Sequence, residues 1–520
     1  MQEDKVAVAA FDKRFFTIYR NKEGKTTHEF TPSFKENREK CTKIENARKA
    51  TWWTNSVPVI HNYLSLIFIG LLTWGLLWCS LGDEWGWDGQ WFRLAVVAIA
   101  AWASGQALQA LTTLPPMLAA LLTGILARNI GFLDMNQYTN VDSFLRKIYP
   151  VIILGKGSLG WDLQFMKNNW WRLATLGTLP WVAEVVVLAF SVHFYLGFPV
   201  IWGLLLGTVY ASMSGAVVLP SVARISADAD CTRNWVQLIG TTSGTDTALS
   251  VGVYGILHSY IFYETDVIYK YVKAGLGLFA GVALGIIMGT VAGKLPSSRD
   301  FYVTELRVIM VVALGLLANM VTSMFGWGGV AGVAVLVCNA TAASFWAQDG
   351  WTLNKNPAAT AYRIMWSTLE PMVFAYSGTF FEINKNLANV LLPGFGILAV
   401  CLFVRLAVAY LTCWDFTFRE KIFICCTWMP KSIVEAVLCP VALDTIAALG
   451  NRGNTMERQW AENIMQLLIQ LILITTPIGF LLTNHLGPML LKTRQKDCEI
   501  IERRSQRKNS IHRSQDEERM

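Results

Sequence analysis

The chain has 520 residues, of which 53% are hydrophobic and only 16% are charged. A soluble domain of average composition carries about a quarter charged residues, so this composition excludes an ordinary soluble protein. It predicts an all-α membrane protein that crosses the bilayer many times. The formal net charge of +7 is unevenly spread, because Lys and Arg cluster in residues 1–50 and 492–520.

The two basic terminal segments predict the orientation of the chain. Basic flanks remain on the cytoplasmic side of a membrane, so both termini are expected there. The N-terminal segment has no short apolar core of the kind that marks a cleavable signal. We expect a cytoplasmic tail at 1–58, a transmembrane exchanger domain at 59–490 and a second cytoplasmic tail at 491–520. Plasma membrane is the expected location, and the basic tails could contact anionic lipid headgroups.

Apolar stretches of membrane-spanning length recur along the chain with short loops between them. Fourteen are predicted, an even number that agrees with two cytoplasmic tails. They lie near residues 59–80, 91–111, 114–129, 143–160, 172–196, 200–225, 235–262, 271–294, 303–323, 326–347, 361–382, 390–412, 421–448 and 461–486.

Two predicted spans are interrupted by helix-breaking residues. The sixth contains SMSGAVVLP, with Gly215 and Pro220, and the thirteenth contains WMPK, with Pro430, followed by Pro440. Proline removes a backbone donor and clashes with the preceding turn. Interrupted helices at matching positions of two halves are the best sequence indication of a secondary transporter's binding site. Two ordinary proline kinks, which membrane helices tolerate, are the alternative.

Asp246 is the most informative residue, because it lies near the middle of an otherwise uncharged stretch. A carboxylate at that depth is costly without a partner or water, and such residues usually handle ions or protons. Arg405 lies equally deep, in LAVCLFVRLAVAYL, and needs a carboxylate partner. Asp246 is the expected partner. The pair would be either a static salt bridge or one that opens when an ion or a proton binds.

Further ionisable residues fall inside predicted spans. Lys431 and Glu435 are spaced so that they could pair on one helix face, or Lys431 could face the ion site. Glu184 is expected to relay protons or to pair with a cation on another span. Lys156 lies toward a helix end, where it either extends to the membrane interface or serves the transport core.

Hydroxyl side chains surround Asp246 on its predicted helix. Thr242, Asp246 and Ser250 form one polar stripe, with Ser243 and Thr245 beside it. Oxygen ligands around a carboxylate suit a hard alkali cation such as Na⁺ or Li⁺. The same hydroxyls could instead hold neighbouring helices together. We predict that Asp246, Thr245, Ser243 and Thr242 bind the transported cation, and that Asp246 also takes the proton.

Motifs for covalent chemistry or nucleotide use are absent from the sequence. It contains no GxxxxGK[ST] phosphate loop, no HExxH metal motif and no nucleophile elbow. The cysteines are scattered, many in apolar runs, and are interpreted as packing residues. We therefore expect neither an enzyme nor a bound cofactor, and no nucleic-acid partner.

Three segments resemble the animal NHA-type Na⁺/H⁺ antiporters of the cation:proton antiporter-2 family. Residues 416–445, FTFREKIFICCTWMPKSIVEAVLCPVALDT, resemble the signature FxFKEKIFIxxxWMPKxxVQAVLGPLALET. GAVVLPSV (215–222) is similar to PAVVVPxM on a broken helix, and LPPMLAALLTGILARNI (114–130) to PPLLGMLLAGFxxRN. The resemblance covers residues 59–490. It implies about fourteen helices in an NhaA-like inverted-repeat fold with two crossing broken helices, assembled as a homodimer.

The resemblance also implies roles by position. Asp246 falls on the family's cation- and proton-binding aspartate, and Arg405 on the basic partner that competes with the ion for it. Lys431 falls on the lysine of the second unwound helix. Glu184 falls on a core-domain glutamate, and Lys156 stands where relatives have arginine.

Three departures from the family pattern bear on the transported ion. Relatives carry Asp-Asp or Asn-Asp where this chain has Thr245-Asp246, and their proline before AVVVP is Gly215 here. A glutamate near the end of the eleventh span is replaced by Phe380. The site has therefore lost one of the family's carboxylates.

The resulting prediction is a secondary active transporter that exchanges Na⁺ or Li⁺ for H⁺ by alternating access around Asp246. Arg405 or Lys431 would compensate the charge of the empty site. One titrating carboxylate predicts near one-for-one, electroneutral exchange. Two alternatives remain open: proton-coupled transport of a small anion such as chloride, because the site is more positive, and a membrane scaffold that does not transport.

Overall fold

The computed structural model describes residues 16–20, 26–30, 52–228, 233–262, 267–327, 329–351, 356–383, 387–448 and 455–517. Most of the predicted N-terminal tail and the last three residues lie outside these ranges. The chain divides into two compact units, Met1–Phe92 and Arg93–Met520. In the first unit, two short strands pair antiparallel, with Phe16 opposite Phe30. Its elements are β1 (Phe16–Arg20), β2 (Thr26–Phe30), α2 (Trp52–Leu81) and the 3₁₀ turn η1 (Gly82–Trp85).

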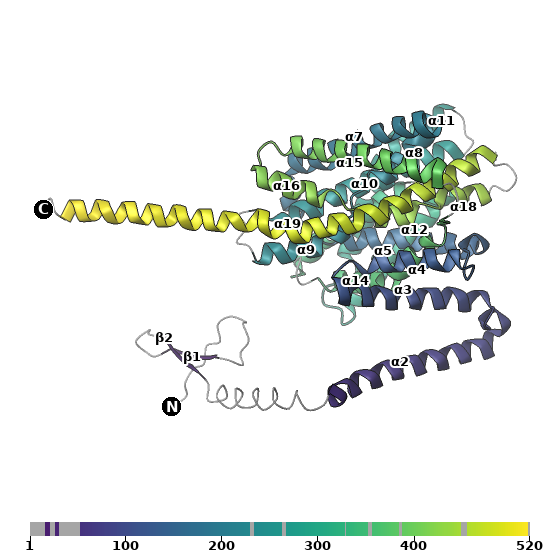
Figure 1. The fold of residues 1–520 in the computed structure, drawn as a ribbon, viewed down its shortest axis with the longest axis horizontal. Coiled ribbons are helices and arrows are strands. Elements are labelled where there is room, and N and C mark those ends of the chain that lie inside the picture. Colours follow the sequence, from purple (N-terminus) through teal and green to yellow (C-terminus); the bar gives the residue numbers. More distant parts are fainter. Residues whose placement is uncertain are drawn as a thin grey trace. The chain divides into compact units, whose positions relative to one another are not determined.

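The second unit is built from helices (Figure 1). Its first half contains α3 (Gln90–Thr112, which begins in the first unit), α4 (Pro116–Asn129), η2 (Met135–Gln137), α5 (Thr139–Ser158), α6 (Leu163–Asn168), α7 (Trp170–Leu196), α8 (Val200–Tyr210), α9 (Gly215–Asp228) and α10 (Trp235–Phe262). Its second half contains α11 (Val267–Lys294), α12 (Val303–Met324), α13 (Val330–Gln348), α14 (Pro357–Gly378), η4 (Leu387–Leu391), α15 (Leu392–Thr412), α16 (Phe418–Thr427), α17 (Ile433–Leu438), α18 (Val441–Ala448) and α19 (Thr455–Glu517).

Each predicted apolar stretch falls on one helix or on a broken set of helices, so the predicted all-α membrane fold is confirmed. Among the described residues, the hairpin of β1 and β2 is the exception. Nine described stretches are long and apolar enough to cross a membrane. α10 is not one of them, because Ser, Thr and Gly around Asp246 lower its hydropathy. The total of fourteen spans remains a prediction.

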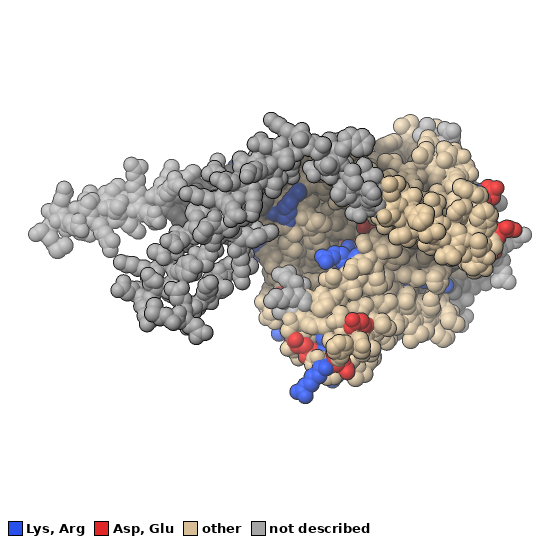
Figure 2. All heavy atoms as spheres, turned by 90° about the horizontal axis from the view of Figure 1, so that it is seen from below, with Lys and Arg blue, Asp and Glu red and all other residues tan. Residues whose placement is uncertain are grey.

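The surface of the helical unit suits a hydrocarbon surrounding. Large apolar side chains stand exposed on several helices, among them Phe279 at 75%, Ile309 at 64% and Phe403 at 73%. Figure 2 shows one face on which charged side chains are sparse among uncharged ones. Lipid tails would cover such surface, which in water would favour aggregation.

Helix ends in this unit follow ordinary capping rules. α16 begins with a capping box, in which the Thr417 side chain accepts from the Glu420 amide and the Glu420 side chain accepts from the Thr417 amide. α7 ends at Gly197, whose φ of 68° is the left-handed conformation that glycine adopts easily. These signals fix where α7 and α16 stop and start, and hence where their buried faces lie.

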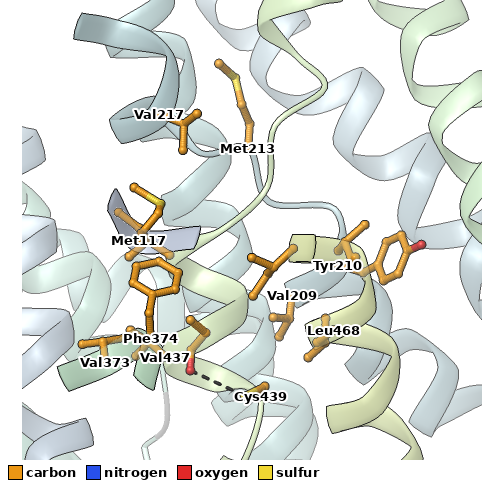
Figure 3. Packing of buried hydrophobic residues seen from close by; sticks show 14 of the residues in the cluster. Met117, Val209, Tyr210, Met213, Val217, Val373, Phe374, Val437, Cys439 and Leu468 are labelled. Atoms are coloured by element: carbon orange, nitrogen blue, oxygen red, sulfur yellow. Dashed lines mark hydrogen bonds between the residues drawn. The ribbon is translucent and has the colours of Figure 1, made fainter. Parts of the chain in front are cut away.

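Tight packing surrounds the segments that carry the site. α7 packs against α8, α10 and α15, and α4 packs against α14. At the α4–α14 contact a Cβ on Gly124 would overlap the carbonyl oxygen of Ala375, so only glycine fits there. Figure 3 shows apolar side chains from α4, α8, α9, α14, α17 and α19 meeting around the two interrupted helices, including Met117, Phe374 and Leu468. A dense apolar core therefore packs against the broken segments on this side.

Candidate functional site

The two interrupted helices meet at their breaks. The first break, residues 211–214, separates α8 from α9, and the second, residues 428–432, separates α16 from α17. The Ser214 amide donates to the carbonyl oxygen of Pro430 at 2.9 Å. The hydroxyls of Ser214 and Ser432 lie 2.6 Å apart. Each break thus satisfies backbone and hydroxyl groups of the other, as unpaired polar groups inside a membrane require.

Three of the four predicted helix-breaking residues lie at interruptions. Gly215 is the first residue of α9, Pro430 lies within the second break, and Pro440 lies between α17 and α18. Pro220 is different, because it lies inside α9. Its assignment to the break was wrong: the helix opens earlier, over Ala211–Ser214, and continues through Pro220 with one backbone donor missing.

Asp246 and Arg405 form the expected pair at this crossing. Arg405 Nη2 donates to Asp246 Oδ2 at 2.8 Å, and the two side chains are 0% and 2% exposed. The Met213 amide, in the first break, donates to Asp246 Oδ1 at 3.1 Å. The buried carboxylate is therefore held by one charge and one backbone dipole.

Glu184 lies on the other side of the same guanidinium. Arg405 Nη1 donates to Glu184 Oε2 at 2.7 Å, and Lys431 Nζ donates to the same oxygen at 2.7 Å. All three side chains are fully buried. Lys431 also donates to the carbonyl oxygen of Tyr210, and Arg405 to those of Ala211 and Trp428. Two carboxylates and two cations, Asp246–Arg405–Glu184–Lys431, thus form one continuous buried chain.

The local pairing of Lys431 with Glu435 is not the one that the structure has, and a role of Lys431 at the ion site remains a prediction. The ammonium group of Lys431 faces Glu184 of α7 rather than Glu435, its neighbour in sequence. Glu435 is 1% exposed, and its Oε1 has no hydrogen-bond partner among the described residues. Glu435 is therefore a buried acid beside the chain of charges but not joined to it.

The hydroxyls predicted as cation ligands do not all face the same way. Thr242 Oγ1 donates to Leu238 O and Thr245 Oγ1 to Thr241 O, both within α10. The methyl groups of both threonines lie against Gly177 of α7. These two hydroxyls are therefore engaged within their own helix, and their role as ligands remains a prediction.

Ser243 lies on a different face of α10, at a cavity of about 520 Å³. The cavity is also lined by residues of the first break, Met213 and Ser214, but not by Asp246. Ser243 Oγ donates to Gly240 O at 2.9 Å. The cavity thus reaches the break that covers Asp246 and stops short of the carboxylate.

Lys156 is the one formally charged side chain among the described residues that line this cavity. Its Nζ lies 5.9 Å from the ring centroid of Trp366, on α14. It is not joined to the chain of charges around Arg405 by any ion pair among the described residues. Its predicted accessory role would therefore be exerted on the cavity and not on Asp246.

Sequence reasoning missed two buried hydroxyls, one on α10 and one in the first break. Thr241 Oγ1 and Ser212 Oγ are buried and have no hydrogen-bond partner among the described residues. Thr241 also lines the cavity. The helical spacing from Asp246 favoured Thr242 and Ser250, and Ser250 instead accepts from Trp181 Nε1 at 2.8 Å. Only the position of α7 reveals which side of α10 is already occupied.

The arrangement can exchange partners at one carboxylate. A monovalent cation or a proton that reached Asp246 would have to displace Arg405 from Oδ2. Among the described residues there is no cluster of three or more His, Cys, Asp or Glu side chains of the kind that retains a metal ion. A carboxylate with neutral oxygen ligands is the kind of donor set that hard cations prefer.

Comparison with known proteins gives the family. The family described as "Sodium/hydrogen exchanger, transmembrane" matches residues 94–484. The chain is 28% identical to sodium/hydrogen exchanger 9B2 of Homo sapiens, covering 85% of this chain and 83% of that protein. It is 29% identical to sodium/hydrogen exchanger 9B1 of Homo sapiens, covering 84% of each.

A solved structure shares the fold. The sodium proton antiporter MjNhaP1 from Methanocaldococcus jannaschii, at pH 8, superposes with a TM-score of 0.65 at 16% identity, covering 76% of this chain and 97% of that one. At this identity the likeness concerns the fold alone. Because the family match spans most of the chain, from α3 to α19, this protein belongs to the sodium/hydrogen exchanger family.

Proposed function

We propose that this chain is a secondary active antiporter that exchanges Na⁺ or Li⁺ for H⁺, by alternating access around Asp246. Membership of the sodium/hydrogen exchanger family supports cation and proton exchange. The carboxylate takes the cation and the proton in turn, and Arg405 occupies it between the two. Thr245, Thr242 and Ser243 are the neutral oxygens proposed to assist when their hydroxyls rotate toward the ion.

The single observation that carries this proposal is the double attachment of Arg405. When a cation or proton takes Asp246, Arg405 keeps Glu184 at 2.7 Å and the carbonyl oxygen of Trp428 at 3.1 Å. A buried charge left without partners would be strongly unfavourable. Because Arg405 has a second carboxylate, it can release Asp246 without that cost. The pair is thus suited to opening and closing.

Charge balance supports electroneutral exchange. The connected chain holds two carboxylates, Asp246 and Glu184, and two cations, Arg405 and Lys431. Only Asp246 borders the break next to the cavity, through Met213. One titrating carboxylate binds one cation or one proton, which gives near one-for-one exchange.

The wider setting belongs to the same proposal. The exchanger domain is taken as residues 59–490, between two cytoplasmic tails, in a homodimer at the plasma membrane and surrounded by lipid. The concentration of Lys and Arg at both ends of the sequence supports this orientation.

The deciding experiment measures proton flux in proteoliposomes under an imposed Na⁺ or Li⁺ gradient. Wild-type protein is expected to move protons against the cation, and Asp246→Asn to abolish that flux. Asp162→Asn is the matched control, since Asp162 caps the short helix α6 and asparagine caps equally well. The proposal fails if Asp246→Asn leaves the flux intact. Replacing chloride with gluconate tests the anion alternative, which predicts a flux that follows chloride and ignores Na⁺.

A further inference from the structure

A second ionic cluster lies apart from Asp246, between α5 and α18. Arg146 Nε lies 2.6 Å from Asp142 Oδ2 and 3.7 Å from Asp444 Oδ2. Asp142 is 1% exposed, and the Asp444 side chain 17%. Two carboxylates therefore share one guanidinium in a largely buried place, and one of them retains contact with the surroundings.

The same guanidinium holds the second broken helix. Arg146 Nη1 donates to the carbonyl oxygens of Ala436 at 3.2 Å and Val437 at 2.9 Å, in the last turn of α17. Ser377 Oγ also donates to Ala436 O, at 2.7 Å, and so does Cys439 Sγ, at 3.5 Å (Figure 3). Carbonyl groups at the C-terminal end of a helix carry partial negative charge. Arg146 thus divides one positive charge between two carboxylates and a helix end.

One carboxyl oxygen in the cluster lacks a partner. Asp142 Oδ1 is buried and has no hydrogen-bond partner among the described residues. The Asp444 carboxylate lies against the same Arg146 Nε as the Asp142 carboxylate, so the two carboxyl groups are close together around one guanidinium. Two ionised carboxylates are both acceptors and repel each other, whereas a proton on either one makes a hydrogen bond between them.

Among the described residues, Arg146 is the cation that forms ion pairs with these two carboxylates. The titratable side chains near the cluster are Tyr149 from α5, Tyr254 and His258 from α10, Tyr376 from α14, and Cys439 beside α18. Of these only His258 can become positively charged, and its Nε2 lies 2.9 Å from Thr445 Oγ1 rather than against a carboxylate. Across α14's end, the Phe380 ring covers Arg146 at 5.7 Å.

We propose that Asp142 and Asp444 form a second proton-binding site, in which one proton is held between their two carboxyl oxygens beside Arg146. The proton comes from water through the partly exposed Asp444, and only an O–H bond forms or breaks. The existence of this site does not depend on the proposed antiport. Its effect on ion exchange does rest on that proposed function.

The position of the site gives it a role in exchange. Loss of the proton leaves two negative charges beside one guanidinium, which draws Arg146 toward the carboxylates and weakens its hold on Ala436 and Val437. The opposite end of α17 follows Ser432, which contacts the first break at Ser214. The protonation state of the pair therefore positions α17 relative to the crossing that holds Asp246.

The first test is the pH profile of cation-driven exchange. Asp444→Asn and Asp142→Asn are each expected to remove one titration step from the pH profile of exchange. In each variant the remaining carboxylate is neutralised by Arg146 and stays ionised. Asp444→Glu keeps both carboxyl groups and should keep the wild-type steepness. Glu462→Gln, on the outer ion pair with Arg458, is the control. The proposal is overturned if both Asn variants give the wild-type profile after scaling, since a static ion pair would do so.

The second test does not depend on transport. Infrared spectra of the purified full-length protein, recorded across a pH titration, are expected to contain a protonated-carboxyl band that both Asn variants lose and Asp444→Glu retains. A band unchanged in both Asn variants overturns the second proton site. Wild-type protein that carries the band but performs no exchange overturns the proposed antiport and leaves this site standing.

Discussion

Arg405 Nη2 donates to Asp246 Oδ2 at 2.8 Å, in a place where neither side chain is more than 2% exposed. A buried ion pair of this kind adds little net stability, because desolvation offsets the attraction. Removing one partner lowers the stability of the protein strongly, since the other charge is then left buried and unpaired. Single substitutions at this pair should therefore have large effects.

Arg405→Ala is expected to destabilise the protein by about 3–5 kcal/mol, since Asp246 loses its charged partner and Glu184 loses one of two. Asp246→Asn should cost less, because Arg405 keeps Glu184. Thermal unfolding in detergent measures both. An Arg405→Ala variant that unfolds at the wild-type temperature would contradict the observed geometry. Paired flux measurements separate an exchanger, in which this substitution stops transport, from a scaffold, in which there is no flux to lose.

Glu184→Gln should weaken cation binding without slowing the maximal rate. With the carboxylate neutralised, the positive charge of Arg405 is balanced by Asp246 alone, so an incoming cation competes against a stronger partner. A tenfold rise in the cation concentration for half-maximal exchange corresponds to about 1.4 kcal/mol. A rise of about that size is expected, with Glu382→Gln, on the outer ion pair with Arg128, as the control. A purely structural Glu184 would instead lower the maximal rate or the stability with no change in the half-maximal concentration.

Helix α10 shows which features of the site can be predicted from the sequence. The spacing of its residues predicts that Thr242, Asp246 and Ser250 share one face, and all three are buried in the structure. The spacing does not reveal that Ser250 accepts from Trp181 or that Thr242 and Thr245 lie against Gly177, because those contacts come from α7.

The helix breaks and the buried charges were also predictable only in part. Proline correctly marks the second interruption at Pro430, but the first opens over Ala211–Ser214, where small polar residues find partners on the other helix. The pairing of Asp246 with Arg405 could be predicted from depth, since each needs an opposite charge. The bridging of two cations by Glu184 could not, because it joins residues from two helices and the second break that are far apart in sequence.

The hydroxyls around Asp246 can be tested by isosteric removal. Thr241→Val removes a buried hydroxyl that lines the cavity and has no partner among the described residues, so it is free to coordinate an ion. Thr245→Val removes one engaged with its own helix. Loss of one oxygen contact is worth about 1 kcal/mol, or roughly fivefold in apparent cation affinity. That loss is expected for Thr245→Val, whose hydroxyl is proposed to rotate toward the ion, and for Thr241→Val, in Na⁺ or Li⁺ titrations of exchange. A loss in Thr241→Val alone would move the binding site to the cavity side of α10 and remove Thr245 from the proposed ligands.

Two glycines on the cavity side of α10 offer a matched pair of substitutions. A Cβ on Gly244 would overlap the indole of Trp161, coming within 2.7 Å of its Cε2, whereas a Cβ on Gly240 would meet Leu219 Cδ2 at 3.4 Å, an ordinary contact. Both residues line the cavity, so both alanines add the same group to the same wall. Gly244→Ala must displace Trp161 into the cavity or push α10 away from it, while Gly240→Ala needs only a small shift. We therefore expect Gly244→Ala to lower the maximal exchange rate by about tenfold, from about 1.4 kcal/mol of added barrier, and Gly240→Ala to exchange at nearly the wild-type rate. Equal rates in the two variants would show that ions reach Asp246 by a route that does not pass Trp161.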